Sequence, residues 1–206
     1  MRPNTIIKAI VFDYGNVLLD WDAHRIFRPY FPGGDQDIDA FFAEVGFMEW
    51  HRQQDAGRSF GEAVAELSAK FPQYAHFLPD YDTRYADSIS GPIAGSVAIL
   101  QRLKQAGFAL YGLSNYSAEK FEFDRPRYKF FDLFDDMVIS GEVHLLKPDP
   151  AIYQVLLAKI GRTAEECVFI DDSLPNVTSA RQLGFSAIHF HSPEQLEDEL
   201  NQLGIL

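Results

Sequence analysis

The stretch that decides the fold is residues 6–17, which read Ile-Ile-Lys-Ala-Ile-Val-Phe-Asp-Tyr-Gly-Asn-Val. Its first part, from Ile6 to Phe12, is apolar apart from Lys8, and Asp13 follows directly. This run is too short and too interrupted for a signal peptide or a membrane span. We therefore predict a strand that ends at a carboxylate.

Further short apolar runs repeat this pattern along the chain. They are residues 108–113, 137–139, 168–170 and 187–188. Nearly continuous apolar runs suit strands that are buried on both faces of a parallel sheet. Between them, residues 91–107 and 149–161 have helical apolar spacing, with proline near the start and glycine at the end. This alternation of strand and helix predicts the α/β class, with a doubly wound parallel sheet.

The segment 20–90 breaks this rhythm. It contains no convincing strand, but it has amphipathic pieces, and Ser59 with Glu62 has the spacing of a helix capping box. We interpret it as a small helical domain, a cap, inserted after the first strand. The predicted organisation is a core formed by residues 1–19 and 91–206, with the cap at 20–90.

The composition limits the classes of partner. The chain has 206 residues, 47% of them hydrophobic, and a formal net charge of −12. Such a surface repels nucleic acid and anionic lipid, so we expect neither a nucleic-acid nor a membrane partner. The single cysteine, Cys167, rules out an intrachain disulfide and favours a reducing cytoplasm. We expect a monomer or a weak homodimer.

Polar residues follow the predicted strands where each one ends. These are Asp13 to Asn16 after the first strand, Ser114 and Asn115 after the second, Lys147 shortly after the third, and Asp171 and Asp172 at the end of the fourth. In an open α/β sheet, ligands bind outside the carboxyl ends of the strands. The sequence therefore predicts one crevice that holds three carboxylates, one ammonium group, a hydroxyl and free backbone amides.

In this order, the segments resemble the four motifs of the haloacid dehalogenase superfamily. The matching residues are Phe12-Asp13-x-Gly15-Asn16-Val17, Leu113-Ser114-Asn115, Lys147-Pro148-Asp149-Pro150, and Phe169-Ile170-Asp171-Asp172-Ser173. The resemblance extends over nearly the whole chain, with the helical cap between the first two motifs. It is greatest to the bacterial α-D-glucose-1-phosphate phosphatase type, which shares the Asp-x-Gly-Asn-Val opening.

The resemblance implies a Mg²⁺-dependent phosphatase that forms an aspartyl-phosphate on Asp13. The metal ligands it implies are Asp13, Asp172 and the backbone carbonyl of Gly15, with Asp171 close by. A carboxylate that approaches a phosphate dianion at ~4 Å is repelled by about 8 kcal/mol at an effective dielectric constant of ~20. A divalent cation bound by oxygen ligands removes that repulsion.

The resemblance also implies that the remaining motif residues bind the phosphate group of the substrate. Lys147 would supply a fixed positive charge to the phosphate and to the attacking oxygen. The Ser114 hydroxyl and the backbone amide of Asn115 would bind phosphoryl oxygens. The expected substrate is a small phosphorylated metabolite, with a sugar phosphate such as a sugar 1-phosphate favoured by the resemblance. Residues 47–55, which mix aromatic and polar side chains, could line its pocket.

The chain departs from the family pattern at Gly15, where most of these phosphatases carry a second aspartate as general acid and base. A missing general acid typically costs ~10²–10⁴-fold in rate. Three readings are open: a leaving group that needs little protonation, a replacement acid such as Asp20, Asp22 or His24, or a weak or inactive phosphate binder.

Two other functions remain as alternatives. The first is a 2-haloacid dehalogenase that uses the same aspartate nucleophile without a metal. The paired acids Asp171 and Asp172 disfavour it, since they would repel a carboxylate substrate unless a cation lay between them. The second is a non-catalytic module that binds a phosphorylated ligand, for which the glycine at position 15 is the only support.

Overall fold

The structure is a computed structural model of the chain, and it describes residues 7–206. Its centre is a five-stranded parallel sheet in the order β5-β4-β1-β6-β7. The strands are β1 (Ala9–Phe12), β4 (Ala109–Ser114), β5 (Asp136–Ile139), β6 (Cys167–Asp171) and β7 (Ser186–His189). The predicted doubly wound α/β sheet is confirmed. Ile6, the first residue of the predicted first strand, and the rest of 1–6 lie outside the described residues.

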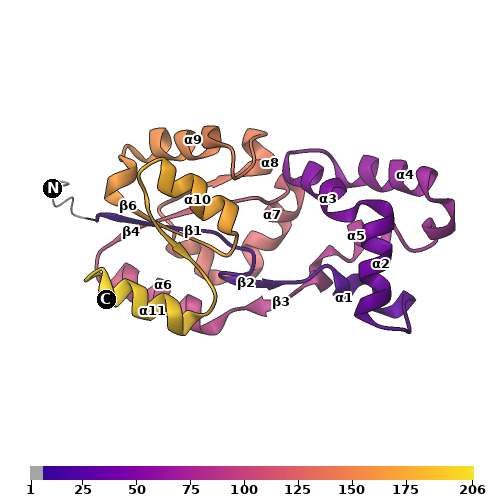
Figure 1. Ribbon diagram of the computed structural model, residues 1–206, viewed down its shortest axis with the longest axis horizontal. Helices are drawn as coiled ribbons and strands as arrows, with labels where there is room; N and C mark the ends of the chain where they lie inside the picture. Colours follow the sequence, from indigo (N-terminus) through magenta and orange to yellow (C-terminus); the bar gives the residue numbers. More distant parts are fainter. Residues whose placement is uncertain (1–6) are drawn as a thin grey trace.

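Helices cover both faces of the sheet (Figure 1). They are α6 (Ala94–Gln105), α7 (Ala118–Asp124), α8 (Ser140–Val143), α9 (Pro150–Ile160), α10 (Leu174–Gln182) and α11 (Pro193–Gln202). Alternate residues of β1 enter opposite hydrophobic clusters, with Ile10 and Phe12 on one side and Ala9 and Val11 on the other. Helices α6 and α11 pack on the first cluster, and α9 and α10 on the second.

Five helices between β2 and β3 lie to one side of the sheet, and we call them the cap helices (Figure 1). They are α1 (His24–Phe27), α2 (Asp35–Val45), α3 (Phe47–Asp55), α4 (Phe60–Lys70) and α5 (Asp80–Thr83). Aromatic rings fill their interior, and Phe42 stacks on Phe47 with ring centroids 4.0 Å apart. The domain limits at residues 20 and 90 stay a prediction.

A two-stranded antiparallel ribbon connects the cap helices to the sheet, and the sequence did not predict it. It pairs β2 (Leu19–Trp21) with β3 (Ile89–Pro92). The Gly91-Pro92 pair therefore belongs to this ribbon, and the helix predicted from residue 91 begins at Ala94. Strands this short carry too few residues to show an alternating apolar pattern.

Arg25 joins β2 to Ser88, the residue directly before β3. Its guanidinium donates to both carboxylate oxygens of Asp20 at 2.9 Å, and to the backbone carbonyls of Asp20 at 2.9 Å and Ser88 at 2.8 Å. Bidentate pairing of this kind fixes orientation as well as distance. The ribbon is therefore a defined connection between the sheet and the cap helices.

None of the helices in residues 7–206 combines the length and the apolar character that crossing a membrane requires.

Candidate active site

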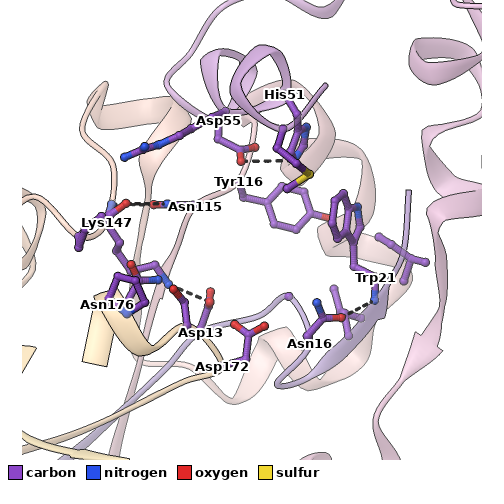
Figure 2. A pocket seen from close by; sticks show the side chains of 18 of the residues that line it. Asp13, Asn16, Trp21, His51, Asp55, Asn115, Tyr116, Lys147, Asp172 and Asn176 are labelled. Atoms are coloured by element: carbon purple, nitrogen blue, oxygen red, sulfur yellow. Dashed lines mark hydrogen bonds and ion pairs between the residues drawn. The ribbon is translucent and has the colours of Figure 1, made fainter. Parts of the chain in front are cut away.

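A cavity of about 580 Å³ lies outside the carboxyl ends of β1, β4 and β6, between the sheet and α3 (Figure 2). The sheet side contributes Asp13, Gly15, Asn16, Asn115, Lys147 and Asp172, and the cap side contributes Trp21, Met48, His51, Arg52 and Asp55. The structure thus brings most of the predicted site residues to one cavity. Ser114 and Asp171 are buried directly behind it.

Asp13 is held in one orientation at the floor of this cavity. Its Oδ1 accepts hydrogen bonds from the Ser114 hydroxyl and the Tyr14 backbone N–H, both at 2.7 Å. Its Oδ2 lies 2.9 Å from Lys147 Nζ. Burial raises the pKa of Asp13 to about 7, with the Lys147 ammonium opposing the shift and the Asp171 carboxylate adding to it. Proton loss from Asp13 is therefore sensitive to any cation placed beside it.

Lys147 is buried between two carboxylates. Besides its contact with Asp13, Nζ lies 2.6 Å from Asp171 Oδ2 and donates to the Leu113 carbonyl at 2.9 Å. These contacts use all three ammonium donors. Burial acts to lower the pKa of Lys147, but the two carboxylates outweigh it and raise the pKa. The ammonium therefore remains a permanent positive charge beside Asp13.

The Asn115 side chain positions the loop that carries Lys147. Its Nδ2 donates to the Lys147 carbonyl at 3.1 Å, and its Oδ1 accepts from the Lys147 backbone N–H at 2.8 Å. The sequence predicted only the backbone amide of Asn115, as a phosphate ligand. This reciprocal pair joins the loop after β4 to the loop before α9, and it depends on a contact between segments far apart in the chain.

Asp171 and Asp172 differ sharply although they are adjacent. Asp171 is fully buried, and its oxygens accept hydrogen bonds from Lys147 Nζ, Asn176 Nδ2 and the Ser173 backbone N–H. Asp172 is partly exposed and lines the cavity, and burial together with the neighbouring Asp171 raises its pKa. Asp171 thus orients Lys147, while Asp172 borders the cavity.

The three carboxylates form a group that could hold a cation. Asp13, Asp171 and Asp172 each offer one oxygen within 4.8 Å of the others. An all-oxygen donor set of this kind suits a hard divalent cation such as Mg²⁺. Because Asp13 and Asp172 line the cavity whereas Asp171 is fully buried behind it, Asp13 and Asp172 are the better placed direct ligands.

The three replacement acids suggested by the sequence do not line the cavity. Asp20 is paired with Arg25, as described above. His24 bridges two carboxylates instead, with Nδ1 2.8 Å from Asp22 Oδ1 and Nε2 2.9 Å from Asp39 Oδ1. All of these contacts lie outside the set of residues that borders the cavity. These side chains support the cap helices rather than the chemistry.

The sequence missed Asp55 as an individual site residue. It is the last residue of α3, it is buried, and it lines the cavity from the cap side (Figure 2). The one signal was the mixed aromatic and polar composition of residues 47–55, which favoured a pocket wall. Which members of that helix face the cavity depends on how α3 packs against the sheet side, and the sequence does not contain that information.

Comparisons with known proteins identify relatives of similar sequence and similar fold. Over 96% of its length the chain is 28% identical to drimenol cyclase drtB of Aspergillus calidoustus, of which it spans 37%. It is 27% identical to sesquiterpene phosphatase astK of Aspergillus oryzae, with 97% of each protein covered. The fold is similar to that of a haloacid dehalogenase family enzyme of Bacteroides thetaiotaomicron, solved in complex with magnesium and inorganic phosphate. In that case the TM-score is 0.73 at 23% identity, with 90% of this chain and 95% of the other covered.

The family signature of these hydrolases matches residues 7–184. Together with the fold and the convergence of the four motifs on one cavity, this shows that the chain belongs to the haloacid dehalogenase-like hydrolase family.

Proposed function

We propose that the protein is a Mg²⁺-dependent phosphatase that hydrolyses a small phosphomonoester through an aspartyl-phosphate on Asp13. The observation that carries the proposal is the buried Lys147 ammonium, 2.9 Å from the Asp13 carboxylate at the floor of the cavity. A carboxylate that attacks a dianionic phosphate ester is repelled by it, and a fixed cation beside the carboxylate reduces that repulsion. The phosphatase name of one relative, and the magnesium and phosphate in the Bacteroides enzyme, support it.

The donor set fits magnesium. Asp13, Asp172 and the backbone carbonyl of Gly15 would hold the ion, with Asp171 behind them. When bound, Mg²⁺ supplies the positive charge that neutralises the phosphate dianion and the developing charge in the transition state.

The chain's own residues prepare the nucleophile. The Ser114 hydroxyl and the Tyr14 N–H donate hydrogen bonds to Asp13 Oδ1. These bonds keep the carboxylate in one rotamer, ready to attack. Lys147 stabilises negative charge on the attacking oxygen and on the phosphoryl group. The backbone amide of Asn115 remains the proposed phosphoryl contact, whereas the expected contact of Ser114 with phosphate would require its hydroxyl to turn away from Asp13 Oδ1. The leaving alcohol then faces the cap side of the cavity.

The cavity wall favours an organic group with an apolar face. Trp21, Met48, Tyr85, Ile89 and Tyr116 line it beside the polar residues. A volume near 580 Å³ lies within the usual range for small-molecule sites. Aromatic walls suit the apolar face of a sugar ring, so sugar 1-phosphates remain candidates. They suit equally the phosphate ester of a hydrophobic alcohol, the class suggested by the sesquiterpene phosphatase relative.

The test is a phosphate-release assay with Mg²⁺ and with EDTA. The panel contains α-D-glucose 1-phosphate, farnesyl monophosphate and p-nitrophenyl phosphate, with 2-chloropropionate in a chloride-release arm. We expect phosphate release that depends on Mg²⁺, and no chloride. Chloride release that EDTA leaves unchanged would establish a dehalogenase instead, and phosphate-ester binding without any turnover would establish a binding module.

A further inference from the structure

The cavity lacks an acid at the place where the family usually has one. Gly15 occupies that position, and a Cβ built on it would meet no atom within 4 Å. The backbone at position 15 therefore has room for a Cβ atom. If the proposed function is correct, the leaving oxygen must obtain a proton from another group unless it leaves as a stable anion.

Asp55 is placed to be that group. Among residues 7–206, the carboxylates that line the cavity are Asp13, Asp55 and Asp172. Asp13 and Asp172 belong to the nucleophile and metal side, whereas Asp55 lies on the opposite wall, across the cavity from them (Figure 2). Its residue is only 7% exposed to solvent. In-line attack by Asp13 would place the departing alcohol on the side of the phosphate away from Asp13, and Asp55 lies on that side of the cavity.

The position of Asp55 is fixed by contacts with the sheet side. The Ser140 hydroxyl, at the start of α8, donates to the Asp55 backbone carbonyl at 2.6 Å. His144 Nδ1 lies 3.0 Å from the Ala56 carbonyl. Gly57 then turns the chain with φ of +102°, and a Cβ there would lie 2.3 Å from His144 Nδ1. These contacts hold the end of α3 against the sheet side, close to the phosphate-binding loops.

The surroundings of Asp55 favour a proton donor. Burial raises the pKa of Asp55. The charge of His51, a hydrogen bond from the Ser117 backbone N–H, and the charges of Lys147 and Arg52 oppose the shift only in part. His51 Nε2 lies 3.4 Å from Asp55 Oδ2, while its Nδ1 is 2.7 Å from the Tyr81 hydroxyl. The imidazole also stacks on Trp21, with ring centroids 5.2 Å apart. His51 is therefore a positioning residue that holds the Asp55 carboxyl toward the cavity.

From this geometry we infer that Asp55 is the general acid and base of the reaction, in place of the aspartate absent at position 15. In the first step an Asp13 oxygen forms a bond to phosphorus, the bond between phosphorus and the alcohol oxygen breaks, and the Asp55 carboxyl gives its proton to that oxygen. In the second step water attacks phosphorus, the bond to Asp13 breaks, and the Asp55 carboxylate takes the proton of the water. Both carboxyl groups are thus restored.

The test compares Asp55→Asn with the wild-type enzyme on two leaving groups, at saturating Mg²⁺. For n-butyl phosphate, whose alkoxide needs a proton, turnover should fall ~10²–10⁴-fold. For p-nitrophenyl phosphate, whose phenolate leaves unaided, the first step should survive and the second should slow. The variant should therefore release a rapid burst of p-nitrophenol, equal to the amount of enzyme, followed by slow steady-state turnover.

The matched control is Glu49→Gln, which removes the same charge from an exposed position on the same helix. It should leave both activities unchanged. Adding Gly15→Asp to Asp55→Asn should restore turnover of n-butyl phosphate, because it places an acid where the structure has room for one. Loss of the p-nitrophenol burst to the same extent as butyl turnover, in a folded variant, would show a structural role and overturn the inference.

A leaving-group series on the wild-type enzyme tests the same point should Asp55→Asn not fold. With an acid in place, the rate should depend weakly on the pKa of the leaving alcohol, and a steep dependence would refute the inference. A different result would contradict the proposed function itself, namely no Mg²⁺-dependent phosphate release by the wild-type enzyme. Normal turnover of n-butyl phosphate by Asp55→Asn would overturn the role of Asp55 alone.

Discussion

At the scale of single residues, the buried ammonium of Lys147 decides whether two carboxylates can share the floor of one cavity. Lys147→Met would leave Asp13 and Asp171 without their counter-charge in a buried position. Breaking a buried pair in this way costs about 3–5 kcal/mol in the free energy of unfolding. We expect that loss in urea denaturation at neutral pH, together with loss of phosphatase activity.

The control is Lys159→Met, which removes an ammonium whose pair with Asp136 is 45% and 39% exposed. Exposed pairs contribute about 0–1 kcal/mol, so this variant should be nearly as stable as the wild-type protein. Equal stability losses for the two variants would contradict the role given to burial.

As a proposed magnesium ligand, the Asp13 carboxyl should link magnesium binding to pH. Its pKa in the folded, metal-free protein is raised to about 7 from 3.8, so between these values the folded state binds more protons than the unfolded state. The stability it contributes is full below the unfolded pKa and is lost as the pH rises through about 7. Mg²⁺ requires the ionised carboxylate and therefore competes with the proton.

We therefore expect the rise in melting temperature caused by Mg²⁺ to be small near pH 5 and to grow up to about pH 8. Differential scanning fluorimetry with and without Mg²⁺ across this range measures it. A magnesium effect that is the same at every pH would contradict Asp13 as a ligand.

The sequence allowed the meeting of Asp13, Ser114, Lys147 and Asp172 to be predicted, because the carboxyl ends of parallel strands share one edge of a sheet. It could not assign the replacement acid. Asp20, Asp22 and His24 are near the first motif in sequence, but they pair with other side chains of the cap region. These three residues are close to Asp13 in the sequence, yet they do not line the cavity that contains Asp13.

At the scale of elements, the junction between α3 and α8 matters most, since it holds Asp55 over the site. Gly57 allows this junction with φ of +102° and no side chain against His144. Gly57→Ala should therefore lower stability and also reduce turnover of alkyl phosphates. Gly107→Ala is the control, because Gly107 has φ of +88° but open space around the Cβ position.

Backbone strain alone costs about 1–3 kcal/mol, so Gly107→Ala measures that cost without a clash. Urea denaturation of both variants should show the larger loss for Gly57→Ala, and only that variant should lose activity. Equal losses in stability, with activity intact in both, would mean that the junction does not position the site.

The five strands of the sheet and the helices α6 and α9 were predictable to within a few residues, because short apolar runs and helical apolar spacing indicate them. The ribbon of β2 and β3 was not. Its strands owe their pairing to Arg25 and to the partner strand 70 residues away along the chain, as the contact between Ser90 and Asp20 illustrates. Contacts of this kind leave no local pattern in the sequence.

At the scale of the whole molecule, the protein carries a formal net charge of −12 and yet buries an ammonium group at the floor of its cavity. In the proposed mechanism, the sheet side supplies the nucleophile, the ammonium and the metal ligands. The cap side supplies the apolar wall and Asp55. The fold and half of the site followed from the sequence, whereas the substrate-facing half depends on how the cap helices lie against the sheet, and only the structure shows that.

The most direct measurement of the central claim traps the covalent intermediate. Enzyme is quenched during turnover of p-nitrophenyl phosphate with Mg²⁺, reduced with borohydride, digested and analysed by peptide mass spectrometry. The mechanism predicts that an aspartyl-phosphate at position 13 is converted to homoserine, with Asp171 and Asp172 unchanged. Full turnover with Asp13 unmodified under these conditions, and with Asp13→Asn still active, would contradict it.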